Sequence, residues 1–142
     1  MNKQEIFEFM NQNPACYLAT TDGNKPYVRG MLIYRADEKG IIFNTGVTKD
    51  LFKQLQKNPN VELCFVNNKN LPDFIQIRVS GIAVLEQDKK IREKIINDRP
   101  SLKTIVEKIG YDAIAVFKVQ KLTATVWTMA TNLEPKEYIK LT

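Results

Sequence analysis

The chain has 142 residues, 44% of them hydrophobic and 26% charged, which is the composition of a globular protein large enough to bury a core without disulfides or metals. No apolar run approaches the roughly 20 residues that cross a bilayer, and the N-terminus lacks a secretory profile, so we expect a cytoplasmic protein with no membrane role. The net charge is +5, but the lysines are interleaved with acids, which argues against nucleic acid and suits anionic cofactors and substrates.

The N-terminal part of the chain changes from a helical to a strand-like pattern. Helical spacing of apolar residues predicts an opening helix over Lys3 to Asn11. Strands are then predicted at Ala15 to Thr20, Tyr27 to Tyr34 and Ile41 to Thr45, and the short turns between them predict a three-stranded meander. A second helix follows, with Leu51 and Leu55 on its apolar face.

The C-terminal part alternates in the same way. Strands are predicted at Val61 to Val66 and at Phe74 to Leu85, where Gly81 marks a bulge. Two short helices are predicted at Asp88 to Asn97 and Ser101 to Ile109. Two last strands are predicted at Ala113 to Val119 and Leu122 to Met129, joined by a turn at Gln120-Lys121, and a polar tail begins at Thr131.

Strands that follow one another along the chain favour antiparallel pairing, and closure into a barrel removes exposed strand edges. The sequence therefore predicts a mainly β protein, a β-barrel with six to seven mostly antiparallel strands and three or four peripheral helices. No repeat or linker divides the chain, so we expect one domain over residues 1–142.

The chain contains no histidine. This excludes Ser-His and Cys-His nucleophile pairs and removes the commonest transition-metal ligand. Cys16 and Cys64 lie in apolar segments, which indicates two buried thiols and no metal pair. If the protein is an enzyme, a bound organic cofactor is expected to carry the chemistry, and no catalytic residue can be assigned.

One combination of residues is typical of an anion site. Arg29 begins an apolar segment, and a guanidinium can hold two phosphate oxygens at once. Thr48 and Lys49 lie at the start of the second helix, where free N–H groups and the positive end of the helix dipole attract anions. The alternative is that Arg29 and Lys49 are solvated surface charges.

Five short motifs follow one another with characteristic spacing. They are Arg29 to Tyr34, Gly40 to Thr45, Thr48-Lys49, Asn58 to Val61 and Gln76 to Gly81. Together they resemble the pyridoxamine 5'-phosphate oxidase-like FMN-binding split barrels, from about residue 16 to residue 85 and more loosely to residue 127. The resemblance implies a homodimer of split barrels, with one FMN in each of two clefts at the subunit interface.

The same resemblance implies roles for individual residues. Arg29, Thr48 and Lys49 would hold the FMN phosphate, and Gly30, Met31 and Leu32 would lie along the flavin ring. A glycine permits close approach of a flat ligand to the backbone, and main-chain amides can bind the edge of the ring.

Four further residues have family roles and competing structural explanations. Asn44 and Thr45 match positions before the phosphate turn, but such residues also cap strand ends. Gln76 matches a glutamine that reaches the flavin, commonly from the other subunit, whereas strand alternation alone makes it a solvated side chain. Trp127 could stack beside the flavin or the subunit interface, or fill the core.

The true oxidases carry a C-terminal Arg-Leu pair for the vitamin's phosphate, and the tail after Thr131 lacks it. We therefore expect an FMN-dependent oxidoreductase that acts on a small planar substrate, similar to the nitroimidazole-reductase-like and general-stress-protein branches. The alternatives are a non-catalytic flavin-binding module, a true pyridoxamine 5'-phosphate oxidase, and a basic barrel that binds nucleic acid.

Overall fold

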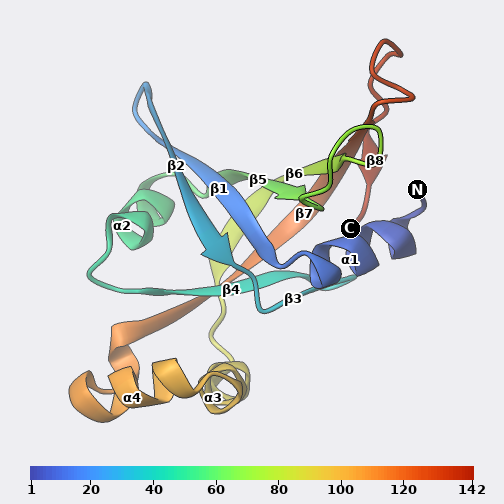
Figure 1. Cartoon of the computed structure of the whole chain (residues 1–142). Coiled ribbons are helices and arrows are strands. Elements are labelled where there is room, and N and C mark those ends of the chain that lie inside the picture. The colour runs from blue at the N-terminus through green and yellow to red at the C-terminus, as the bar shows by residue number, and fades with distance from the viewer.

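The structure is a computed structural model that describes residues 1–142. An eight-stranded antiparallel sheet curls into an open barrel with four α-helices around it, which confirms the predicted fold class (Figure 1). The strands are β1 (Ala15–Asp22), β2 (Lys25–Leu32), β3 (Arg35–Asp37), β4 (Gly40–Gly46), β5 (Asn60–Val66), β6 (Ile75–Leu85), β7 (Ile114–Thr128) and β8 (Ile139–Lys140). The helices are α1 (Lys3–Gln12), α2 (Asp50–Lys57), α3 (Lys89–Asp98) and α4 (Pro100–Ile109), with a short 3-10 turn at Tyr111–Ala113.

The strand order is β2-β1-β5-β6-β7-β4-β3, and β8 pairs with β7. No pairing joins β2 to β4, so the barrel is split between these two strands. Inside the barrel, 24 buried residues form the main hydrophobic core, and α1 contributes four of them from its apolar face. The alternation of buried and exposed residues along the strands is what directs one set of side chains to this core.

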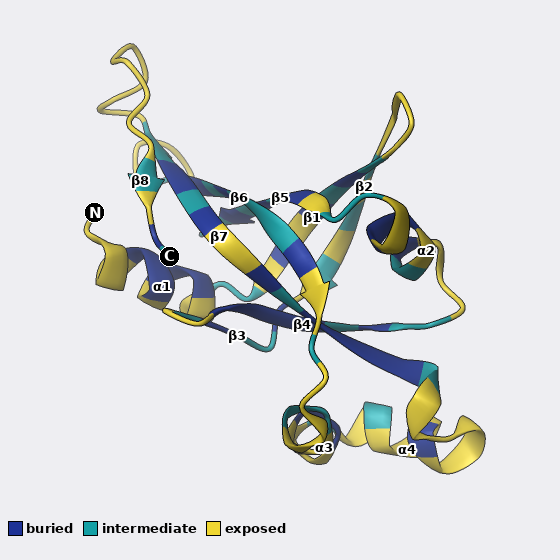
Figure 2. Ribbon diagram, turned by 180° about the vertical axis from the view of Figure 1, so that it is seen from behind, coloured by how far each residue is buried: buried dark blue, intermediate teal, exposed yellow.

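Helices α3 and α4 lie outside the barrel and are exposed over most of their surface (Figure 2). Two small apolar clusters attach them. Ile95 of α3 packs on Ile42 and Val116, while Ile96 and Val106 pack on Ile114. These contacts hold the connection between the two helices close to β4.

The predicted meander is wrong at its second step. β1 and β2 form a hairpin, but β4 pairs with β7, with Phe43 opposite Phe117. The chain leaves β2 at Ile33 and Tyr34, whose amides donate to Pro14 O (3.0 Å) and Ile42 O (2.7 Å). The strand predicted to reach Tyr34 therefore ends at Leu32, and the short β3 takes the place beside β4.

The turn predicted at Gln120-Lys121 is also wrong, because β7 runs through this point as one strand, where the sequence predicted two. β6 pairs with both of its halves, Ser80 lies opposite Thr123 and Ile82 lies opposite Gln120. The extra residue on β7 forms a bulge in which Lys121 has φ +54°. The bulge predicted at Gly81 is thus confirmed, although the inserted residue belongs to the neighbouring strand.

The C-terminal segment after Thr131 is not only a polar tail. β8 pairs with β7 at Thr123 and Ala124, and Leu141 is buried in the main core. No helix combines the length and the apolar character that a membrane crossing requires.

Candidate functional site

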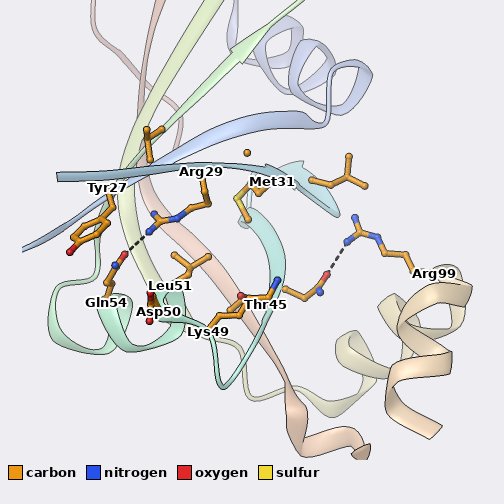
Figure 3. A pocket seen from close by; sticks show the side chains of 13 residues that line it. Tyr27, Arg29, Met31, Thr45, Lys49, Asp50, Leu51, Gln54 and Arg99 are labelled. Carbon is orange, nitrogen blue, oxygen red and sulfur yellow. Dashed lines mark hydrogen bonds between the residues drawn. The ribbon is translucent and has the colours of Figure 1, made fainter. Parts of the chain in front are cut away.

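A cavity of about 520 Å³ lies at the split between β2 and β4, beside the N-terminal end of α2 (Figure 3). Its volume is in the range of cofactor and small-molecule sites, roughly 300–1,000 Å³. Seven of the ten residues proposed from the sequence line it: Arg29, Gly30, Met31, Leu32, Asn44, Thr45 and Lys49. These seven residues come from three parts of the chain, β2, the end of β4 and the start of α2, which meet at this cavity.

β2 supplies one wall of the cavity through its strand alternation. Tyr27, Arg29 and Met31 are half-buried, whereas Val28 and Leu32 are exposed on the opposite face. Gly30 shares that exposed face, and a Cβ built on it would meet no atom within 4 Å. Packing within one chain therefore does not require glycine at position 30.

Arg29 is fixed by neutral acceptors. Its Nη1 donates to Thr20 Oγ1 (2.8 Å) and Leu18 O (3.2 Å), and its Nη2 donates to Gln54 Oε1. Thr20 and Gln54 are buried and bonded to each other at 2.6 Å, so they form a rigid support. A guanidinium has five N–H donors, and these contacts leave two of them for a ligand.

No carboxylate forms an ion pair with Arg29. Burial lowers the pKa of its guanidinium, and the more distant Asp50 carboxylate partly opposes this shift. Arginine nevertheless stays protonated at neutral pH because its ordinary pKa is above about 12. A half-buried cation without a counter-ion attracts an anion to the cavity.

The start of α2 adds to this positive potential. Lys49 is the N-cap residue in extended conformation, and no side chain caps the helix. The first amides of α2 are therefore open to an external acceptor. Lys49 also lines the cavity, although it lies one residue before the first turn in which the sequence placed it. Thr48 is exposed and is not among the lining residues.

The other end of the cavity is formed by Arg99 from the connection between α3 and α4 (Figure 3). Its Nη1 donates to Asn44 Oδ1 at 2.8 Å, and its Nη2 donates to Ile33 O at 2.9 Å. Counting Arg29, Lys49 and Arg99 against Asp50, the lining is cationic. The arrangement can bind an elongated, acceptor-rich anion.

Gln76 and Trp127 do not line this cavity. They lie opposite each other on β6 and β7 and line a second pocket of about 350 Å³. Trp127 is half-buried outside the main core, with its ring 5.8 Å from that of Phe74 and its Nε1 bonded to Asn132 Oδ1 at 2.9 Å. Within one chain these two residues do not join the Arg29 site.

Sequence reasoning missed Thr20, Gln54 and Arg99. A signal for Gln54 was present, because it falls between Leu51 and Leu55 on the apolar face of α2, where a polar side chain needs a buried partner. Arg99 had no local signal, since its position depends on how α3 and α4 pack against β4.

The structure is an open β-barrel with a cationic cavity at its split, which is a candidate site for a small anionic ligand. Over residues 3–128 the chain matches the family model described as pyridoxamine 5'-phosphate oxidase, and it belongs to that family, as the sequence motifs predicted. No group of three or more Cys, Asp or Glu side chains is arranged to hold a metal ion.

Individual relatives agree with this assignment. A pyridoxine/pyridoxamine 5'-phosphate oxidase from Psychrobacter cryohalolentis is 38% identical over 89 residues, which cover 61% of this chain and 40% of the relative. The matched part thus spans about two fifths of that curated protein's length.

Solved structures share the whole fold. A NimC/NimA family protein from Clostridium acetobutylicum has a TM-score of 0.76 and 26% identity, with 99% of this chain and 94% of that chain covered. An FAD-binding protein from Mesorhizobium loti has a TM-score of 0.67 and 12% identity, with 90% and 96% covered.

Proposed function

We propose that the protein is a flavoprotein that binds FMN in the cavity at the barrel split and acts as an oxidoreductase on a small planar substrate. The observation that carries the proposal is the Arg29 guanidinium, which is half-buried and supported by Thr20 and Gln54 without a carboxylate partner. A phosphate would supply the missing negative charge. The family membership and the FAD-binding relative support a flavin as the rest of the ligand.

The residues present fit such a ligand. Arg29, Lys49 and the uncapped amides of α2 are suited to hold the phosphate. Thr45 is buried beside them, and Thr48 is one residue from the helix N-cap, close enough in sequence to join the phosphate site. Met31 faces the cavity from β2, and Gly30 and Leu32 also line it, so β2 offers a strand along which the flat ring can lie.

A bound flavin would supply reversible hydride and electron transfer, chemistry that no side chain of this chain provides. The chain's own part is to bind the phosphate, orient the ring against β2 and present its edges to N–H donors. A turnover assay distinguishes an oxidoreductase from a protein that only stores or senses flavin.

We also propose that two copies of the chain complete the site. The outer face of the β1–β2 hairpin, formed by Tyr17, Val28, Gly30 and Leu32, exposes three large apolar side chains. Gln76 and Trp127 lie in a separate pocket of the same chain, so a second copy is the route by which they would reach the flavin. One subunit alone leaves the cavity too open to cover a flavin on both faces.

The test is a flavin titration followed by a turnover assay. Arg29→Ala is expected to weaken FMN binding at least tenfold, because charged hydrogen bonds contribute about 1.5–3 kcal/mol. Lys53→Ala is the matched control, since Lys53 is an exposed cation on α2 outside the cavity lining. Unchanged affinity in Arg29→Ala would remove Arg29 from the site.

Reduced nicotinamide with a panel of quinones and nitroaromatics then separates an enzyme from a binding module. We expect reduction of at least one acceptor by the flavin-loaded protein. Tight flavin binding without turnover on any acceptor would favour the non-catalytic module, and oxidation of pyridoxamine 5'-phosphate would favour a true oxidase despite the C-terminal tail.

A further inference from the structure

The second arginine of the cavity has no part in the phosphate site described above. Arg99 lines the cavity from the side opposite Arg29 (Figure 3). Arg29 belongs to the barrel, whereas Arg99 is carried by the α3–α4 pair outside it. The cavity thus has a cation at each end.

The Arg99 side chain is held in place from three directions. Asn44 Oδ1 accepts from it on the β4 side at 2.8 Å, and Ile33 O accepts at 2.9 Å just after β2. The ring of Tyr34 lies 5.7 Å from the guanidinium carbon, and the Tyr34 hydroxyl is itself fixed by Asp98 at 2.6 Å. These contacts orient the guanidinium before any ligand arrives.

This end of the cavity offers donors only. Arg99 forms no ion pair, and its two hydrogen bonds leave three of its five N–H groups free. Because a guanidinium can only donate, Asn44 must direct its oxygen to Arg99, which leaves the two N–H groups of its amide nitrogen without a partner in the chain. A ligand group that fits here must carry acceptor atoms or negative charge.

We propose that Arg99, together with the Asn44 amide, binds the acceptor-rich edge of the flavin ring and stabilises the negative charge that the ring gains on reduction. This inference rests on the proposed FMN site, with the phosphate at the Arg29 end. Addition of two electrons and one proton to the neutral ring leaves one net negative charge, so a fixed cation at the ring edge favours the reduced form.

The test compares Arg99→Ala and Arg99→Lys with the wild type in two measurements. The first is the two-electron midpoint potential of the bound flavin, titrated with dithionite. Arg99→Ala is expected to weaken binding of reduced relative to oxidised flavin at least tenfold, equivalent to a fall of about 30 mV for a two-electron couple. Arg99→Lys retains the charge without the planar fork and is expected to show a smaller fall.

The second measurement is the ratio of FMN to riboflavin affinity. Arg99→Ala is expected to leave this ratio unchanged, whereas Arg29→Ala reduces it, because of the two arginines only Arg29 lies at the proposed phosphate site. Lys103→Ala serves as the control for the α3–α4 pair, since Lys103 is an exposed cation of α4 outside the cavity lining.

The outcomes separate the two proposals. If the wild type binds no flavin, both the proposed function and the role of Arg99 at the ring edge are wrong. If flavin binds and Arg99→Ala leaves the potential at the wild-type value in a folded protein, the assignment of Arg99 to the ring edge is wrong. A potential unchanged alongside a raised KM for the acceptor substrate would also overturn it, because Arg99 would then contact the substrate.

Discussion

Arg29 illustrates how the barrel keeps a cation half-buried without neutralising it. Thr20, Gln54 and a backbone carbonyl accept its hydrogen bonds, so its desolvation is partly compensated while its charge remains available. A carboxylate in place of either side chain would satisfy the guanidinium internally. Neutral acceptors around Arg29 are therefore what the proposed anion site would need.

Gln54→Glu tests this reasoning with almost no change in shape. The new carboxylate would pair with Arg29, and we expect FMN affinity to fall at least tenfold while the fold is retained, because the pair offsets the charge that attracts the phosphate. The measurement is a fluorescence titration of FMN. Gln56→Glu makes the same change on the exposed side of α2 and is the control. Equal losses in both variants would indicate a general charge effect.

At the scale of elements, the close contact of β6 and β7 depends on Gly81. A Cβ at this position would lie 2.6 Å from Val119 Cγ1 and 2.8 Å from Gln120 O, next to the bulge at Lys121. Glycine at position 81 therefore lets β6 and β7 stay paired across the bulge. β7 also pairs with β4 and β8, so it connects several parts of the sheet.

Gly81→Ala is expected to lower the free energy of unfolding by about 1–3 kcal/mol, the usual range for overpacking in a tight interior. Urea unfolding measures this effect. Gly46→Ala is the matched control within the sheet, because a Cβ on Gly46 of β4 would make only ordinary contacts, to Lys49 Cγ at 3.7 Å and Ala113 O at 3.8 Å, and this variant should unfold close to the wild-type midpoint. If Gly81→Ala unfolds at the same urea concentration as the wild type, β6 and β7 can move apart at the bulge and do not require glycine there.

The elements differ in how far the sequence determined them. Periodicity placed the four α-helices and most strands, because their apolar faces repeat locally. It did not predict the pairing of β4 with β7, which joins residues about 70 positions apart and depends on the packing of Phe43 on Phe117. Gln120-Lys121 resembled a turn because a bulge and a turn have similar polar composition.

The residues that line the cavity also differ in how far the sequence alone could predict them. Arg29, Lys49 and Asn44, which line it, could be predicted from short stretches of sequence: Arg29 and Lys49 by their local chemistry, and Asn44 by the family resemblance. Arg99 could not, because its place depends on the docking of Ile95 on Ile42 and Val116. Gln76 and Trp127 line a separate pocket of the same chain, so their predicted place at the flavin depends on the assembly of two copies.

At the scale of the whole molecule, the outer face of the β1–β2 hairpin is the expected contact between two copies. Tyr17→Glu introduces a charge on this face, outside the cavity lining. We expect the wild type to sediment as a dimer of 16.3 kDa chains and the variant to shift toward monomer, because burial of an unpaired charge is unfavourable. FMN affinity should fall with it.

Ile109→Glu is the control for this experiment, since Ile109 is 66% exposed on α4. It should remain dimeric and bind FMN normally. A wild type that sediments as a monomer with FMN still bound would contradict the shared cleft.

The central claim is that the cavity at the barrel split recognises a flavin through its phosphate. The most direct measurement is calorimetric titration of the wild-type protein with FMN and, separately, with riboflavin, which lacks only the phosphate. We predict that FMN binds at least tenfold more tightly, since the phosphate contacts include charged hydrogen bonds of about 1.5–3 kcal/mol. Equal affinities for the two flavins, or no binding of either, would contradict the claim.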